Sequence, residues 1–309
     1  MSKLELLAVD PLDKIQVEIC YRGKDYCIRS SNTVKYLGVT FEPSLYMDSH
    51  ITAIIPELKR RTSILRGLCW NSPTRLYRQM YVSTIRSKIA YCGNLITYSN
   101  NLRKLETIQN DNLRFILRAF MTSPVLTLRT ALNLPALQTY AQYLKACFSI
   151  HLAKSSVQKL KTNPRILSPV DEGDHMINQN FQDDNEPSRK KLKELLRQDM
   201  VADYSQYDGY FRAVFPDYPS FQLFRSPGIT SAAYRLATSH LNIGSHRSRL
   251  KLKGPTKCRH CQNQLETVNH LLSHYGYRSR HSFLELLRGS RGTHVDRIRL
   301  FKLVQRLRL

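Results

Sequence analysis

The sequence predicts a mainly α-helical protein: a short N-terminal β-hairpin plus one strand, a helical bundle, and a small C-terminal unit with paired cysteines, paired histidines and helices. Three observations predict this fold class. Apolar and polar residues alternate with period two only before residue 44, and helical periodicity fills residues 45–165. The paired cysteines and histidines follow between residues 258 and 274. A length of 309 residues allows two compact units.

Residues 1–44 form the predicted β region. Alternation over 15–21 and 26–28 predicts two strands, with a turn at Arg22-Gly23-Lys24-Asp25 between them. Residues 35–41 predict a third strand. The β pattern then stops, which places a boundary near residue 44.

Residues 45–165 predict a helical bundle. Apolar residues recur at helical spacing from 45 to 68, where Pro56 is expected to kink or split the helix. Ser72-Pro73 is a helix start signal, with Ser72 as the N-cap. Further helices are expected over 102–120 and 137–161.

The composition changes at residue 166. Residues 166–188 hold six acids and no Lys or Arg, which predicts an acidic linker. This linker is either a flexible connector or a segment that lies back on a basic groove. Residues 189–250 predict a helical and aromatic connector, in which the aromatic side chains pack the loops or, alternatively, stack on bases.

Residues 251–290 carry the most specific motif of the chain, with the pattern C-x2-C-x8-H-x3-H. Two cysteines three positions apart on a tight turn can face one ion, and histidines four apart lie on one face of a helix. Four such ligands close a tetrahedron and leave no place for a reactive water, so we predict a structural Zn²⁺ site in a zinc finger. The alternative is two buried thiols beside two surface histidines. The predicted ligands are Cys258, Cys261, His270 and His274.

Positive charge dominates the chain, with 47 Lys+Arg against 24 Asp+Glu and a formal charge of +23. A polyanion usually compensates such an excess, so RNA or DNA is the expected partner; an anionic membrane surface and a merely basic protein are the alternatives. Residues 291–309 predict a basic C-terminal helix that contacts phosphate, docks on the body or binds a membrane surface. The expected nucleic-acid-binding side chains are Lys59, Arg60, Arg61, Arg247, Arg249, Lys251, Lys253, Lys257, Arg259, Arg278, Arg280, Arg297 and Lys302.

The cellular compartment is predicted from what the sequence lacks. It has no apolar run of the roughly 20 residues that span a bilayer, and no signal peptide. Its seven cysteines do not form a disulfide framework, so Cys20, Cys27, Cys69, Cys92 and Cys147 are expected to be core thiols. We expect an intracellular, nuclear protein without a membrane partner.

Several motifs resemble one protein family in combination. They are Val34-Lys35-Tyr36-Leu37-Gly38-Val39, Lys59-Arg60-Arg61, Tyr91-Cys92-Gly93, residues 105–114, residues 237–241, Cys258-x2-Cys261 and residues 266–272. Together they resemble the C-terminal region of a non-LTR (LINE-type, jockey- or I-like) retrotransposon reverse transcriptase. Most of residues 33–165 is similar to the end of the palm and the helical thumb, and most of 230–285 is similar to the zinc-finger tail.

Two departures from that family matter. Its polymerase catalysis depends on an aromatic-Ala-Asp-Asp turn and a further palm aspartate, and this sequence has no such motif; Asp183-Asp184 lies in the acidic linker. Two-metal phosphoryl transfer needs closely placed carboxylates, so we expect no enzymatic activity from this chain. The family usually has a cysteine as the fourth zinc ligand, at the place of Tyr275, so His274 must substitute.

The resemblance and the charge together predict a nucleic-acid-binding fragment or domesticated derivative of such a reverse transcriptase. Two alternatives stay open. One is a protein-interaction or assembly module whose helical bundle binds a protein partner. The other is an accessory part of an RNA-directed DNA polymerase that an upstream segment completes.

Overall fold

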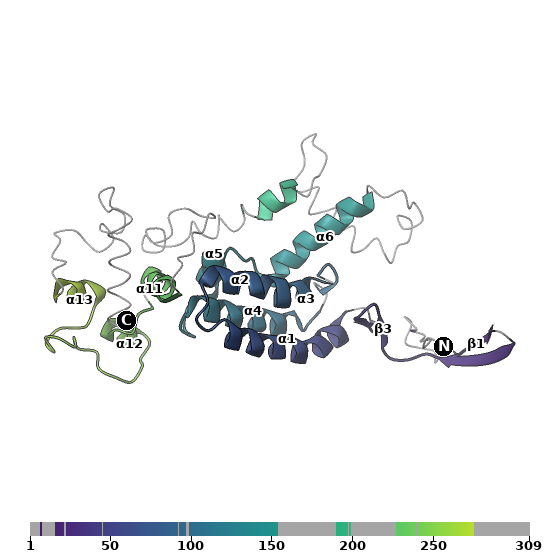
Figure 1. Cartoon of the computed structure of the whole chain (residues 1–309), viewed down its shortest axis with the longest axis horizontal. Coiled ribbons are helices and arrows are strands. Elements are labelled where there is room, and N and C mark those ends of the chain that lie inside the picture. Colours follow the sequence, from purple (N-terminus) through teal and green to yellow (C-terminus); the bar gives the residue numbers. More distant parts are fainter. Residues whose placement is uncertain are drawn as a thin grey trace. The chain divides into compact units, whose positions relative to one another are not determined.

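The structure, a computed structural model, is mostly helical and contains two small antiparallel sheets (Figure 1). It describes residues 7, 16–21, 23–44, 46–91, 93–96, 99–153, 190–196, 198, 227–238 and 240–274. The named elements are β1 (Gln16–Tyr21), β2 (Lys24–Arg29), β3 (Val34–Tyr36), β4 (Val39–Phe41), α1 (Asp48–Leu68), α2 (Thr74–Tyr81), the π-helix η1 (Val82–Arg86), α3 (Ser87–Ala90), α4 (Leu102–Leu117), α5 (Val125–Leu132), α6 (Leu137–Ala153), α11 (Pro227–Ala237), α12 (Gly244–Arg249) and α13 (Val268–His274).

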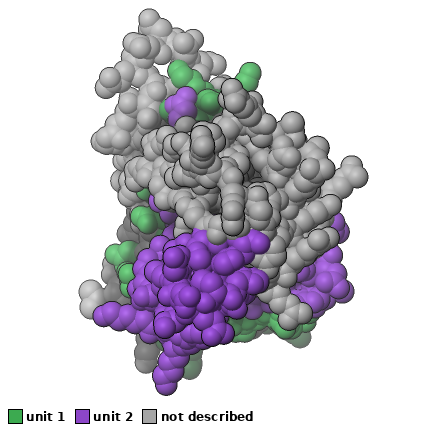
Figure 2. Space-filling model, turned by 90° about the vertical axis from the view of Figure 1, so that its left-hand side faces the viewer, with its two compact units in different colours: residues 1–64, 82–109, 135–196 green, residues 65–81, 110–134, 197–309 purple. Residues whose placement is uncertain are grey.

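The chain divides into two compact units, and each unit is assembled from three stretches of sequence (Figure 2). Unit 1 comprises Met1–Ile64, Val82–Gln109 and Pro135–Leu196. Unit 2 comprises Leu65–Tyr81, Asn110–Leu134 and Arg197–Leu309. The long helices α1 and α4 each contribute residues to both units.

The β region contains two hairpins, which corrects the expectation of one hairpin plus a single strand. β1 and β2 pair antiparallel from Gln16 opposite Arg29 to Tyr21 opposite Lys24, which confirms the expected hairpin but shortens its turn, because Lys24 and Asp25 belong to β2. The stretch expected as a third strand instead folds back on itself, so that β3 pairs with β4. Leu37 and Gly38 both have positive φ, of 47° and 82°, which is the backbone that a two-residue hairpin turn requires.

Polar contacts attach β4 to the start of α1 in unit 1. The Glu42 carboxylate accepts hydrogen bonds from the Asp48 backbone N–H at 2.8 Å and from the Ser49 hydroxyl. A negative charge at this end of a helix satisfies N–H groups that have no partner within the helix. His50 is buried and its Nδ1 accepts from the backbone N–H of Thr40 at 3.3 Å. The hairpin and the helix therefore share one polar junction.

Arg86, at the end of η1, organises the interior of unit 1. Its side chain is buried, donates to Gln109 Oε1 at 2.8 Å and lies 3.4 Å from the Pro135 carbonyl oxygen. Its guanidinium also lies 4.4 Å from the centre of the Tyr140 ring, a cation–π contact. Gln109 donates to the same Pro135 carbonyl at 3.1 Å. One arginine thus joins η1, α4 and the start of α6.

The far end of α6 holds a small apolar cluster in unit 1. Ala146 and Ile150 of α6 are buried against Leu192, and Cys147 and Leu195 pack at its margin. Residues 190–196 are helical, in agreement with the helical pattern expected there. This cluster explains why the connector after the acidic stretch returns to α6.

In unit 2, α11 contacts α5 and the segment that follows α4. The hydroxyls of Thr127 and Tyr234 are 2.8 Å apart and both side chains are buried. The Arg235 guanidinium lies 4.4 Å from the centre of the Phe120 ring and donates to the Arg118 carbonyl oxygen at 2.8 Å. α5 was not among the helices expected from the sequence; it follows Pro124 and ends at Asn133, whose φ of 49° is a left-handed helix cap.

Two further expectations change. α1 is one helix from Asp48 to Leu68, so Pro56, which is exposed, does not split it. Cys20 and Cys27 are exposed and are not core thiols, whereas Cys69 is buried and Cys147 is half-buried. The acidic linker 166–188, the aromatic residues of 201–226 and the basic helix 291–309 lie outside the described residues. Among the helices that the structure describes, none is long and apolar enough to cross a membrane.

Candidate metal centre

The two cysteines of the motif lie on a tight turn that backbone hydrogen bonds close. The Cys258 N–H donates to the Gln264 carbonyl at 2.7 Å, and the Gln262 N–H donates to the Cys258 carbonyl at 2.8 Å. Lys257 and Leu265 form an antiparallel bridge at the base of this turn. Gln262 has a φ of 55°, so the chain reverses direction directly after Cys261. Both sulfurs are thereby held on the same side of the turn.

The two histidines come from the short helix α13. The Thr267 hydroxyl accepts from the His270 backbone N–H at 3.2 Å and so caps the helix. One turn of helix separates His270 from His274 and brings their rings together, with centroids 4.7 Å apart. Leu271 between them is fully buried, which anchors the helix by its other face.

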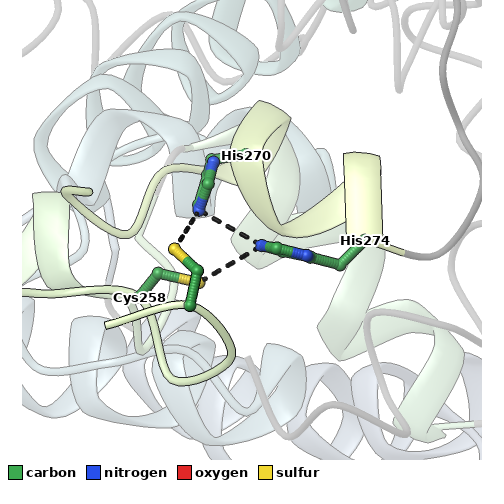
Figure 3. A group of neighbouring side chains, drawn as sticks. Cys258, His270 and His274 are labelled. Carbon is green, nitrogen blue, oxygen red and sulfur yellow. Dashed lines mark hydrogen bonds between the residues drawn. The ribbon is translucent and has the colours of Figure 1, made fainter. Parts of the chain in front are cut away.

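The side chains of the four predicted ligands converge; Figure 3 labels Cys258, His270 and His274 among them. The possible ligand atoms of Cys258, Cys261, His270 and His274 all lie within 4.8 Å of one another. Cys258 Sγ is 3.7 Å from His274 Nε2, Cys261 Sγ is 3.1 Å from His270 Nε2, and the two Nε2 atoms are 3.2 Å apart. A tetrahedral zinc ion with ordinary bond lengths separates S from N by about 3.5 Å and N from N by about 3.3 Å. The group is therefore close enough to hold one metal ion.

The turn also favours the thiolate form of a ligand. Backbone N–H groups of Gln264 and Asn263, followed by the contacts with His270 and Cys258, lower the pKa of the Cys261 thiol to about 6. A thiolate is the form that binds metal, and N–H donors stabilise its charge. His260, between the two cysteines, is not among the four; its ring lies 5.3 Å from that of His274.

A buried carboxylate, missed by sequence reasoning, attaches the turn to α12. Glu266 is 2% exposed and accepts from Gly244 N at 3.1 Å and from Arg259 N, Nε and Nη2 at 3.2, 2.6 and 3.1 Å. Burial alone would raise the pKa of Glu266, but the Arg259 hydrogen bonds and charge hold it below its usual value. Four donors around one carboxylate make a buried charge tolerable.

Gly244 is required at this junction because the backbone comes too close for any side chain. A Cβ at this position would lie 1.9 Å from the Thr256 carbonyl oxygen. Around the same junction, unit 2 has a cleft of about 770 Å³. Its lining includes Arg247, Lys257, Arg259 and Gln262, together with Pro255 and Glu266.

The predicted nucleic-acid-binding residues differ in how they are used. Lys59, Arg60, Arg249, Lys251, Lys253 and Lys257 are exposed. Arg61 donates to the Thr84 carbonyl at 2.8 Å and pairs with Glu57, while Arg247 donates to Asn242 Oδ1 at 2.6 Å and Arg259 is bound to Glu266. Lys59, Arg60 and Arg61 belong to unit 1, and the others named here belong to unit 2. Arg278, Arg280, Arg297, Lys302 and the alternative ligand Tyr275 lie outside the described residues.

No family model, no curated protein and no solved structure matches this chain.

Proposed function

We propose that this chain binds RNA or DNA through basic surfaces, and that a structural zinc ion in a Cys2His2 finger holds one of these surfaces in shape. The observation that carries the proposal is the convergence of two sulfurs and two imidazole nitrogens within 4.8 Å, beside a cleft whose lining includes the exposed Lys257. Zinc suits this donor set because it takes thiolate and imidazole ligands in a tetrahedron. The finger is too small for a core of its own, so the ion supplies folding energy.

Zinc content tests the first half of this proposal. The purified chain is expected to hold one zinc per molecule, and Cys258→Ser/Cys261→Ser is expected to hold none. Cys20→Ser/Cys27→Ser is the matched control, because it removes two exposed cysteines far along the chain from the motif and should leave one zinc. Undiminished zinc in the first variant would remove the finger from the proposal.

Charge supports the second half. Among the described residues of unit 2, thirteen Lys and Arg stand against two acids, Asp111 and Glu266. Asp111 pairs with Arg114 at 3.4 Å, and Glu266 is buried against Arg259. The two negative charges are thus already compensated locally, so the net field of this unit attracts a polyanion. Phosphates bound by lysine and arginine release counterions, which makes the affinity depend steeply on salt.

Binding of labelled RNA, single-stranded DNA and duplex DNA between 50 and 200 mM salt tests it. We expect the logarithm of the affinity to fall linearly with the logarithm of the salt concentration. Lys253→Gln/Lys257→Gln should lower the slope for duplex DNA by up to about 1.8, since each phosphate contact contributes about 0.9. Arg103→Gln/Lys104→Gln removes the same charge from unit 1 and is the control. Affinity unchanged by salt would refute nucleic-acid binding by charge.

The origin of the chain is part of the same proposal. The motif resemblance supports a fragment or domesticated derivative of a non-LTR retrotransposon reverse transcriptase, acting in the nucleus without polymerase activity of its own. Primer extension by the purified chain with Mg²⁺ would contradict the last point and favour an accessory polymerase part. A protein partner retained by residues 45–165 after nuclease treatment would favour an assembly module instead.

A further inference from the structure

The tryptophan of this chain is exposed in unit 2. Trp70 is 62% exposed, in the turn that follows α1. Leu68, two residues before it, is 71% exposed, and Met121 is 74% exposed. A large aromatic side chain normally contributes more to stability than other side chains when it is buried, so the exposure of Trp70 on a packed unit needs an explanation.

The Trp70 ring has two neighbours, Phe115 and Arg118. The Trp70 and Phe115 ring centroids are 5.8 Å apart, and Phe115 is in turn packed edge-on against the buried Tyr77 at 5.3 Å. Arg118 donates to the Trp70 carbonyl oxygen, and its guanidinium lies 5.8 Å from the indole ring centre. The indole is therefore exposed but supported by neighbours on both α4 and the segment that follows it.

Arg118 is itself fixed by the fold. Its φ is 49°, a left-handed backbone conformation, and its carbonyl oxygen accepts from the Ser231 hydroxyl at 3.2 Å and from Arg235 at 2.8 Å. Two elements thus hold the backbone that presents this guanidinium. Because the aromatic ring and the neighbouring cation are already fixed, they lose little conformational entropy when a flat, negatively charged ligand binds.

We infer that Trp70 is a stacking platform for an unpaired base of a single-stranded nucleic acid, and that the Arg118 guanidinium, 5.8 Å from the ring centre, meets the adjoining phosphate. The inference rests on the proposed function and adds a site to it. The charge of unit 2 favours a nucleic acid over a protein as the ligand. The two acids among its described residues, Asp111 and Glu266, are each paired with an arginine, and a phosphate backbone complements the remaining positive charge. Every base has a π-face, so stacking tolerates any sequence.

Because Trp70 is the one tryptophan in the sequence, its fluorescence reports on this site alone. Titration with a short oligo(dT) or oligo(U) is expected to quench the tryptophan and to protect it from iodide, while a duplex of the same length does so much less. This measurement uses the unaltered chain, so it does not depend on whether a variant folds.

Substitution gives the second readout. Trp70→Ala should weaken the binding of labelled oligo(dT) roughly 5- to 150-fold, the range that loss of one stacked base covers. The salt dependence should keep its slope, since no phosphate contact is lost, and Trp70→Phe should recover part of the affinity. Leu76→Ala, which removes another half-exposed apolar side chain of the same unit, is the control and should change nothing.

The outcomes separate this inference from the proposed function. Oligonucleotide binding that leaves the fluorescence unchanged and is unaffected by Trp70→Ala overturns the stacking site and leaves nucleic-acid binding in place. Equal quenching by an acidic polypeptide overturns it too, because the patch would then be a protein-docking surface. Failure to bind any nucleic acid at low salt refutes the proposed function and, with it, this site.

Discussion

Removing the Glu266 carboxylate should weaken zinc binding, although Glu266 is not one of the four candidate ligands. The carboxylate is 3% exposed, and it joins Arg259, next to Cys258, to Gly244 at the start of α12. If the finger folds only with its ion, whatever stabilises the folded finger also raises its affinity for zinc. The perturbation is Glu266→Ala.

The magnitude follows from what the change leaves behind. Breaking a buried ion pair by deleting one partner costs about 3–5 kcal/mol. The Arg259 side chain is 37% exposed and can recover water, which places the cost at the lower end. The N–H of Gly244 is left buried without its acceptor, which adds to it. We therefore expect about 3 kcal/mol, or roughly 100-fold weaker zinc binding, since each 1.4 kcal/mol is tenfold.

Competition with a chromophoric zinc chelator measures this loss. Glu266→Gln should lie between wild type and Glu266→Ala, because an amide oxygen can still accept from Arg259 while the amide N–H₂ faces another donor. Gln264→Ala, an exposed side chain on the same turn, should bind zinc as tightly as wild type. A Glu266→Ala chain whose zinc affinity is within twofold of wild type would refute the coupling between the carboxylate and the metal.

Three other perturbations have defined outcomes. Arg86→Met should destabilise unit 1 by about 3 kcal/mol in urea unfolding, because Gln109 Oε1 and the Pro135 carbonyl each lose a charged donor and the cation–π contact with Tyr140 is removed; a loss below 1 kcal/mol would contradict its organising role. Burial, then the neighbouring histidine and arginine, lowers the pKa of His246 to about 4, so between pH 6.5 and 4 the unfolded chain binds more protons and stability falls on acidification. His246→Asn should remove the contribution of His246 to this loss of stability, which is up to about 1.4 kcal/mol per pH unit. If the variant and the wild type have the same pH profile of stability at saturating zinc, His246 is excluded as a source of the loss. Gly244→Ala should lower both the chelator concentration that removes half of the zinc and the melting temperature, because the added Cβ meets the Thr256 carbonyl. Wild-type values for both would show that the backbone at this junction adapts.

The parts of this fold that the sequence predicts are those with a local cause. Helical periodicity places α1, α4 and α6, and the spacing of four ligands predicts which side chains converge at 258–274. The β3–β4 turn was missed because a leucine at positive φ, such as Leu37, is rare. α5 has eight residues, about two turns, and this length is too short to establish a helical period although five of the residues are apolar.

Long-range contacts account for the rest. Glu266 and Gly244 are 22 positions apart, and nothing in either neighbourhood announces a hydrogen bond between them. The exposure of Trp70 is equally invisible in the sequence, since tryptophan is expected to be buried and its neighbour Cys69 is. Such features depend on how distant segments meet, and periodicity carries no information about that.

A count of cations overestimates the surface available to a polyanion, and the type of cation shows where. Arg61, Arg247 and Arg259 each use the guanidinium fork to bind a carbonyl or carboxylate of the chain itself. Arginine suits this because its donors are planar and fixed, whereas lysine is a flexible, strongly hydrated point charge. Lysines 251, 253 and 257 are exposed on the segment between α12 and the cysteine turn. Arg247 and Arg259, which flank this segment, thus maintain the local shape, and the lysines within it are the side chains whose removal should change the salt dependence of binding.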